Sequence, residues 1–278
     1  MKTSAVNPKN VPKMPIQSVH QPIAVFDSGL GGLTVLRALR AQLPHEDYFY
    51  FADTRFLPYG DRPETFLRER GVLIAHALVE RGAKALVIAC NTATAAAAEA
   101  SRAAIDLPIV ALEPGVKPAA ALTRNGVVGV LATTRTLQSE RFQRLVGNHA
   151  SHLQVLSQAC PGLAVAIEMQ GPDSPEVESL LDVFVAPLAA AGADVVVLGC
   201  THYPWVAEAI RRRMPGEVSL LDTGEAVARQ LDRLLGAAGL LGGGSGRLTV
   251  ATSGAPHKVS ATVDRLWGEH LPVEHWEP

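Results

Sequence analysis

The chain is short of several features that mark particular classes of protein. It has three cysteines in 278 residues, an odd number without close pairs, which argues against a disulfide scaffold and fits the reducing cytoplasm. A net charge of −2 supplies no basic field, so nucleic acid and anionic membrane are not expected as main partners. No apolar run approaches the ~20 residues that span a bilayer. Residues 1–20 also lack the apolar core of a signal peptide, so we expect a cytoplasmic protein.

The residues that are present predict an α/β fold. Hydrophobic residues make up 47% of the chain, enough for a core, and 278 residues suit two lobes. Short apolar runs alternate with helical patterns, as in parallel sheets with crossover helices. The runs are continuous, which is typical of strands buried on both faces. We expect strands at 22–26, 48–51, 85–89, 108–112, 126–131, 154–156, 194–198 and 248–252.

Two turn-forming segments, Glu113–Gly115 and Asp222–Gly224, indicate where one lobe ends and the other begins. The place of the C-terminal tail is not determined by the pattern of elements alone, and we assign it to the first lobe. We therefore expect a flexible N-terminal extension, a first α/β domain and a second α/β domain at residues 1–20, at 21–113 together with 225–278, and at 114–224.

Two segments share one construction, an apolar strand that ends on a cysteine. Cys90 follows residues 85–89 and Cys200 follows residues 194–199, and small polar residues come directly after each. A lone cysteine in a strand is more often a small hydrophobic residue, but polar neighbours at the carboxyl end of a strand indicate an open crevice. Both cysteines are expected to precede helices, whose N–H groups favour a thiolate. Two such thiols on two lobes predict acid–base chemistry from both faces of one small molecule.

Three polar residues are expected near these thiols. His202 follows Cys200 by two residues and could lower the pKa of the thiol or shuttle its proton, although a turn that merely packs is the alternative. Asp27 and Ser28 end the first strand, just before a glycine-rich turn. An acid there would repel phosphate and suits an ammonium group or the orientation of a thiol, whereas capping of the next helix is equally compatible.

Further candidates carry weaker signals. Asp53 and the run Pro58–Gly60 follow the second strand. These residue types also favour tight turns, so a purely structural role is the alternative to a functional one. In the second lobe, the position that Asp27 and Ser28 hold in the first is occupied by Thr133, Thr134 and Thr136. Their hydroxyls, with backbone amides, could bind a carboxylate.

Two residues lie where no regular element is expected. Glu168 falls in the less regular segment 160–171, where a solvated face is the default, and Cys160 precedes a proline outside any evident strand end and is taken as structural. The cysteines and nine histidines never fall at paired ligand spacing, so no metal site is predicted.

At these residues the chain closely resembles glutamate racemases of the cofactor-independent aspartate/glutamate racemase superfamily. The similarity extends over nearly everything from about residue 22 onward. It is carried most specifically by Val25–Gly32, Pro58–Gly60, Ala89–Ala93 and Leu198–Pro204, and more weakly by Asp53, Glu113–Gly115, Leu131–Thr133, Leu221–Thr223 and Thr252–Gly254.

The resemblance implies two pseudo-symmetric α/β domains, each with a mainly parallel sheet flanked by helices, and an active site in the cleft between them. It implies interconversion of L- and D-glutamate without metal or pyridoxal phosphate, with D-glutamate feeding peptidoglycan synthesis. Cys90 would take the α-proton of D-glutamate and Cys200 that of L-glutamate. Asp27 and His202 resemble the helper residues beside the thiols, and Asp53 and Glu168 match further acidic positions. The implied substrate contacts are Asp27, Ser28, Tyr59, Gly60, Asn91, Thr92, Thr133, Thr201 and His202.

The chain also departs from many relatives. The segment after Cys160 is less aromatic and less proline-rich, which bears on the role of Glu168. The N-terminal extension resembles relatives that depend on the activator UDP-N-acetylmuramoyl-alanine. The sequence leaves monomer and homodimer open. Competing functions are a racemase of aspartate or a related acid, a Cys–His hydrolase using Cys200 and His202, and a non-catalytic two-lobed binding protein.

Overall fold

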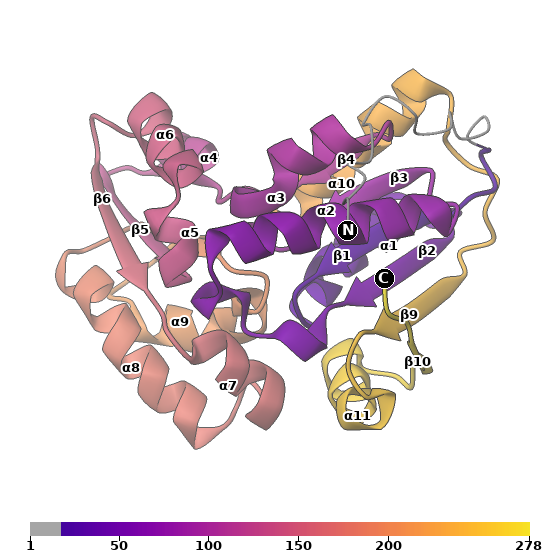
Figure 1. Ribbon diagram of the computed structural model, residues 1–278. Helices are drawn as coiled ribbons and strands as arrows, with labels where there is room; N and C mark the ends of the chain where they lie inside the picture. Colours follow the sequence, from indigo (N-terminus) through magenta and orange to yellow (C-terminus); the bar gives the residue numbers. More distant parts are fainter. Residues whose placement is uncertain (1–17) are drawn as a thin grey trace, which may run out of the picture.

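A computed structural model describes residues 18–278 and shows two parallel sheets, each covered by helices on both faces (Figure 1). All strand pairs of the first sheet are parallel, and its order is β10-β9-β2-β1-β3-β4. Its strands are β1 (Ile23–Asp27), β2 (Tyr48–Ala52), β3 (Ala85–Ile88), β4 (Ile109–Ala111), β9 (Leu248–Thr252) and β10 (Val273–His275).

Helices pack on the two faces of the first sheet in two separate apolar clusters. One cluster joins the strands to α1 (Leu33–Gln42), α10 (Gly224–Ala238) and α11 (Pro256–Trp267). The other joins them to α2 (Glu64–Glu80) and α3 (Asn91–Ala104). Two 3₁₀ turns, η1 (Thr54–Phe56) and η2 (Tyr59–Asp61), lie between β2 and α2. Because both faces are covered, β1, β2 and β3 are buried along their whole length, which explains their continuous apolar runs.

The second sheet has the order β6-β5-β7-β8 and is also entirely parallel. Its strands are β5 (Val127–Ala132), β6 (Gln154–Ala159), β7 (Val195–Gly199) and β8 (Ser219–Leu221). The helices around it are α4 (Val116–Leu122), α5 (Thr134–Gln138), α6 (Glu140–His149), α7 (Leu163–Gln170), α8 (Pro175–Ala190), the 3₁₀ turn η3 (Tyr203–Val206) and α9 (Ala207–Arg213).

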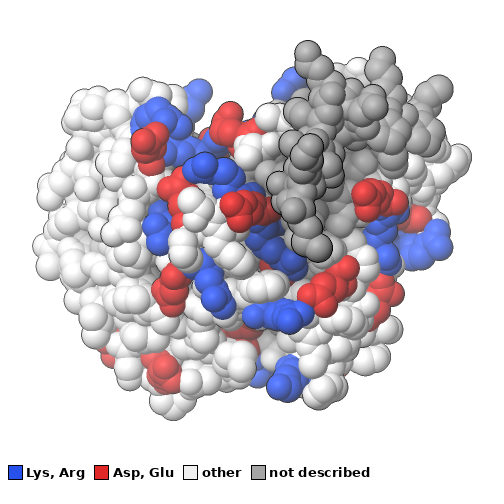
Figure 2. Space-filling view, in the orientation of Figure 1, with Lys and Arg blue, Asp and Glu red and all other residues white. Residues whose placement is uncertain are grey.

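The chain passes between the sheets twice. It leaves the first sheet after β4 and returns to it after β8, so β9 and β10 extend the first sheet. The two connections lie together, because a Cβ on Gly115 would stand 3.3 Å from Cγ2 of Thr223. Within residues 18–278, no helix has the length and apolar character needed to cross a bilayer. Acidic and basic side chains are interspersed on the face shown in Figure 2.

The predicted α/β class is confirmed, and three local expectations are wrong. The strand expected at 154–156 continues to Ala159, so Cys160 does follow a strand end. Glu168 lies in the regular helix α7 and is buried, because this segment packs its apolar side on the second sheet. Cys200 is followed by a turn and η3, whereas Cys90 is the N-cap of a full helix.

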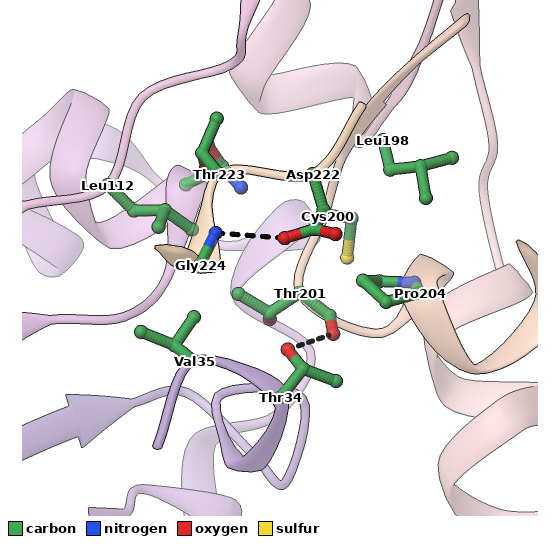
Figure 3. Close-up of a pocket in the computed structure, with 11 residues that line it drawn as sticks. Thr34, Val35, Leu112, Leu198, Cys200, Thr201, Pro204, Asp222, Thr223 and Gly224 are labelled. Atoms are coloured by element: carbon green, nitrogen blue, oxygen red, sulfur yellow. Dashed lines mark hydrogen bonds between the residues drawn. The ribbon is translucent and has the colours of Figure 1, made fainter. Parts of the chain in front are cut away.

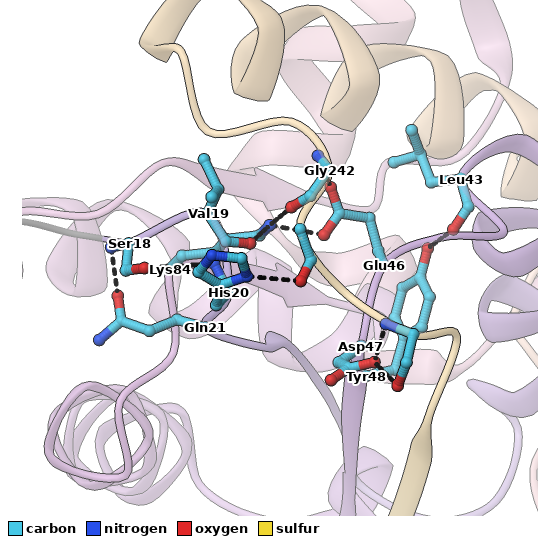
Figure 4. Close-up of polar contacts among 12 residues, drawn as sticks. Ser18, Val19, His20, Gln21, Leu43, Glu46, Asp47, Tyr48, Lys84 and Gly242 are labelled. Atoms are coloured by element: carbon cyan, nitrogen blue, oxygen red, sulfur yellow. Dashed lines mark hydrogen bonds and ion pairs between the residues drawn. The ribbon is translucent and has the colours of Figure 1, made fainter.

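The first described residues are held at the amino edge of the first sheet (Figure 4). Lys84, which is completely buried, donates to the Val19 carbonyl at 2.7 Å and to Glu46 Oε2 at 2.5 Å. His20 Nδ1 lies 2.7 Å from the carbonyl oxygen of Gly243. The remainder of the predicted extension, residues 1–17, lies outside the described residues.

Candidate active site

Cys90 and Cys200 line the same pocket, one from each sheet. Cys90 lies two residues after the end of β3, and Cys200 directly follows β7. The space between the pocket walls, including the part open to solvent, is about 430 Å³. Its walls are Ser28, Leu57, Pro58, Tyr59, Gly60, Cys90, Asn91, Thr92, Thr133, Ala164, Val165, Gly199, Cys200, Thr201 and His202. The carboxyl ends of both sheets therefore meet at one site, as open α/β sheets favour.

The thiol of Cys90 is the N-cap of α3. Its Sγ accepts a hydrogen bond from the Ala93 N–H at 3.4 Å and lies 3.4 Å from Ser28 Oγ. Burial and the nearby charge of Asp27 nevertheless raise the pKa of Cys90 well above its ordinary value, and these two hydrogen bonds only reduce the rise. The N–H group at the start of α3 therefore favours the anion, as expected, but burial and the charge of Asp27 outweigh it.

Asp27 lies behind Ser28 and does not line the pocket, although it is completely buried. Its Oδ1 accepts from the Ser28 N–H at 2.8 Å, and its Oδ2 accepts from the Gly32 N–H at 2.6 Å. Burial raises the pKa of Asp27 to about 6, against the opposing influence of His202 and the two N–H groups. Asp27 thus couples to Cys90 through its charge and through the Ser28 hydroxyl.

On the other side of the pocket, His202 lies between a thiol and a carboxylate. Its Nδ1 is 3.7 Å from Cys200 Sγ, and its Nε2 is 2.7 Å from Glu168 Oε2. Burial alone would lower the pKa of His202, but its contacts with Cys200 and Glu168 hold the pKa well above the ordinary value. Each ring nitrogen therefore has a polar partner, and a protonated ring would donate to both neighbours.

Glu168 also joins the two sheets. The Leu30 N–H, in the turn after β1, donates to Glu168 Oε2 at 2.8 Å. Two glycines permit this close approach: a Cβ on Gly29 would collide with Glu168 and Leu57, and a Cβ on Gly31 would collide with Thr201 and His202. The glycine-rich turn is required for the backbone to pack directly against the His202 side of the site.

Asp53 lies one layer behind the pocket wall. Tyr59, which lines the pocket, donates its hydroxyl to Asp53 Oδ2 at 2.6 Å. Arg70 of α2 donates to both carboxylate oxygens, from Nη2 to Oδ1 at 2.8 Å and from Nε to Oδ2 at 2.9 Å. Both carboxylate oxygens of Asp53 therefore accept hydrogen bonds from Tyr59 or Arg70.

Threonine hydroxyls connect the two sheets across the pocket. Thr92 Oγ1 lies 2.9 Å from Thr133 Oγ1 and 3.3 Å from Thr136 Oγ1. Thr133 is the N-cap of α5 and accepts from the Thr136 N–H at 3.2 Å. Asn91 Oδ1 is buried without a protein partner in the described part of the chain, so it is available to a bound molecule.

A second, smaller pocket, with about 210 Å³ of space including the part open to solvent, flanks Cys200 and Asn91 beside the connections between the sheets (Figure 3). On its walls Thr34 donates its hydroxyl to the Thr201 carbonyl at 3.1 Å, and the Gly224 N–H donates to Asp222 Oδ1 at 2.9 Å. The first of these bonds ties α1 to the turn after Cys200.

The structure thus brings the predicted residues together in two layers. Ten of them line the pocket: Ser28, Tyr59, Gly60, Cys90, Asn91, Thr92, Thr133, Cys200, Thr201 and His202. Asp27, Asp53 and Glu168 lie behind these and bond to them or to their backbone. Sequence reasoning missed Arg70. Arg70 could have been noticed, because its spacing from the apolar residues Leu67 and Ile74 places a charge on the buried face of α2.

Residues 18–278 contain no group of three or more His, Cys, Asp or Glu side chains arranged to hold a metal ion. The polar groups of the pocket are thiols, hydroxyls, an amide and an imidazole. This set suits proton transfer and hydrogen bonding to a small polar molecule.

The class of protein follows from the fold, from the two free thiols that line one pocket, and from the match to a protein family. Residues 34–231 match the Asp/Glu/Hydantoin racemase family. The chain belongs to this family, and it is an amino-acid racemase, an isomerase.

The particular proteins to which the chain is similar are glutamate racemases. That of Ectopseudomonas mendocina (strain ymp) is 50% identical over 254 residues, which cover 91% of this chain and 97% of the relative. The structure of isoform RacE1 from Bacillus anthracis matches with a TM-score of 0.84 and 31% identity, covering 93% of this chain and 98% of that one. Escherichia coli glutamate racemase, solved with L-glutamate and the activator UDP-MurNAc-Ala, matches with a TM-score of 0.81 and 30% identity, covering 92% and 97%.

Proposed function

We propose that this protein interconverts L- and D-glutamate by a two-base mechanism, with Cys90 and Cys200 as the two catalytic groups. The observation that carries the proposal is that thiols from two different sheets line one pocket. Racemisation removes a proton from one face of the α-carbon and delivers a proton to the other face. Two groups on opposite walls do this without turning the substrate over.

In this scheme the two thiols start in different protonation states. Burial and Asp27 favour the protonated form of Cys90, which makes it a proton donor. His202 Nδ1 lies 3.7 Å from Cys200 Sγ, and a protonated ring there would donate to a thiolate on Cys200. Cys200 then takes the α-proton of L-glutamate while Cys90 delivers its own proton to the opposite face, which yields D-glutamate. The reverse reaction begins with thiolate on Cys90 and thiol on Cys200.

The α-proton is weakly acidic while the substrate carboxylate stays ionised, so the site must stabilise the developing carbanion. Preformed donors supply this, and loss of one typically costs about 3–4 kcal/mol in comparable oxyanion sites. We assign this role to polar groups near Ser28, Asn91, Thr92 and Thr201, which all lie on the pocket wall. Tyr59, Gly60 and Thr133 complete the proposed substrate contacts, and Asp27 and Glu168 act as helpers behind the thiols.

We further propose that the sheets define two domains, residues 21–113 with 225–278 and residues 114–224, which close on the substrate and exclude water. The reaction proposed here needs no cofactor, because the two cysteines supply both proton transfers. Its product would feed peptidoglycan synthesis in the cytoplasm.

The decisive experiment is circular dichroism of L-glutamate incubated with the protein and no added cofactor. Decay of the optical signal to zero supports the proposal, and an unchanged signal contradicts it. L-aspartate in a parallel sample distinguishes the related aspartate activity. Calorimetric binding of glutamate without turnover would indicate a binding protein, and a covalent thioester on Cys200 in the mass spectrum would indicate a hydrolase.

Activation by UDP-N-acetylmuramoyl-alanine is a finer proposal, supported by the E. coli structure solved with this activator. The test compares the full chain with a protein that lacks residues 1–17, each with and without the nucleotide. Residues 18–20 are kept because Lys84 and Gly243 hold them. Equal activity in all four samples would remove the idea.

A further inference from the structure

The structure holds a buried charged cluster that the mechanism above does not use. Arg70 is 8% exposed and Asp53 is completely buried, yet neither lines the pocket. Their two parallel hydrogen bonds form a bidentate pair, the arrangement that orients both partners most strongly. Phe56 covers the outer face of the guanidinium, with Cζ 4.6 Å from the ring centroid.

This cluster leads directly to the substrate pocket through Tyr59. The Tyr59 hydroxyl donates to Asp53, and its ring packs at 6.3 Å from that of Phe26. The side chain is 2% exposed and stands on the pocket wall beside Leu57 and Gly60. Because both the ring and the hydroxyl of Tyr59 are held, its side chain has a single orientation, and the pocket wall that it forms is fixed in shape.

Asp53 of this cluster and the neighbouring Gly60 face different sheets of the active site. The Asp53 N–H donates to the Asp27 carbonyl at 2.9 Å, which joins the ends of β1 and β2. Gly60 faces the second sheet, because a Cβ on it would lie 3.6 Å from Cβ of Thr133. A shift of the segment from Leu57 to Gly60 would therefore change the pocket and the contact between the sheets together.

A buried ion pair is weak evidence for stability, since apolar residues of similar volume often serve equally well. An orienting role accounts better for this one. We propose that Arg70 is a positioning residue for the racemase reaction, which through Asp53 fixes Tyr59 and the segment Leu57–Gly60 in the shape that binds glutamate. The inference rests on the proposed glutamate activity, and it assigns Asp53 an indirect role.

The test is steady-state kinetics of Arg70→Lys with both enantiomers. Lysine keeps the charge but not the bidentate geometry. We expect KM for L- and D-glutamate to rise about tenfold while kcat changes less than about threefold, the pattern of lost ground-state binding. Arg68→Lys is the matched control, because Arg68 lies exposed on the same helix and pairs with the exposed Glu64. It should keep wild-type constants.

Tyr59→Phe leaves the ion pair intact and tests the same route. Its KM should rise by a similar factor, and the double variant Arg70→Lys/Tyr59→Phe should be no worse than the poorer single variant. The proposal is overturned if Arg70→Lys lowers only the melting temperature, if the KM of Tyr59→Phe is unchanged, or if the two effects multiply. Wild-type protein that fails to racemise glutamate in the same assay refutes the proposed function instead.

Discussion

The carboxylate of Glu168 lies 2.7 Å from Nε2 of His202 and places the other ring nitrogen, Nδ1, 3.7 Å from the sulfur of Cys200. The same Glu168 oxygen accepts from the Leu30 N–H of the first sheet. Cys200 and Glu168 together raise the pKa of His202, and Glu168 also joins the two sheets. In the proposed mechanism the His202 ring supports Cys200 as the base for L-glutamate.

Replacing Glu168 with glutamine should lower kcat/KM about 100-fold, within the usual range for a group that supports acid–base catalysis. The loss must be equal for both enantiomers, because the equilibrium constant of a racemisation is one. The asymmetry should appear in the α-deuterium isotope effect, which should increase more with L-glutamate, the proposed substrate of Cys200. Glu140→Gln on the surface of α6 is the control. An equal change of the isotope effect with both enantiomers would contradict the assignment.

Each pocket cysteine should be essential for racemisation. Cys90→Ala and Cys200→Ala should each abolish the change in circular dichroism, because one face of the α-carbon loses its proton donor or acceptor. In D₂O, Cys200→Ala should still exchange the α-proton of D-glutamate and Cys90→Ala that of L-glutamate, as followed by NMR. Cys160→Ala is the matched buried control, since Cys160 does not line the pocket. Near-native racemisation by either single variant would exclude a two-base mechanism that uses Cys90 and Cys200.

The raised pKa of Asp27, about 6 in the folded protein against 3.8 as its ordinary value, makes stability depend on pH. Between these values the folded state binds more protons than the unfolded state, so this group makes stability fall as pH rises from about 4 to about 6. The free energy of unfolding should lose roughly 3 kcal/mol from this source across that window.

Asp27→Asn should remove this slope, which urea unfolding at pH 4.5 and pH 7 would measure. Hydrogen bonds from Ser245 and Arg247 outweigh the desolvation of Asp47 and lower its pKa to about 2. Asp47 is therefore ionised at both pH values and does not contribute to the difference between them. Identical pH dependence in wild type and variant would show that Asp27 is not held as described.

Lys84→Met should destabilise the protein without impairing catalysis. The pair of Lys84 and Glu46 is buried at the amino edge of the first sheet, and removing one partner of such a pair typically costs about 3–5 kcal/mol. Arg144→Met, which breaks an exposed pair with Glu140, should cost less than about 1 kcal/mol. Urea unfolding measures both. An equal loss of unfolding free energy in the two variants, or a changed KM in Lys84→Met, would contradict a purely structural role for the pair of Lys84 and Glu46.

Much of this molecule follows from its local sequence. Apolar runs before Cys90 and Cys200 predict buried parallel strands, and the polar residues after them predict the edge where a site forms, because these signals lie within a few consecutive residues. The segment around Glu168 was misjudged, since its helix depends on packing against the second sheet and its periodicity is weak.

Tertiary structure alone decided which residues act together. Glu168 meets Leu30 across 138 residues and His202 across 34, and Arg70 reaches Asp53 across 17, separations that no periodic pattern encodes. The electrostatics of the site have the same origin: burial raises the pKa of Cys90 and Asp27, whereas contacts with Cys200 and Glu168 raise the pKa of His202. The sequence by itself determined the strands and the two thiols, and folding determined their electrostatic surroundings, because desolvation exists only once the chain has closed around them.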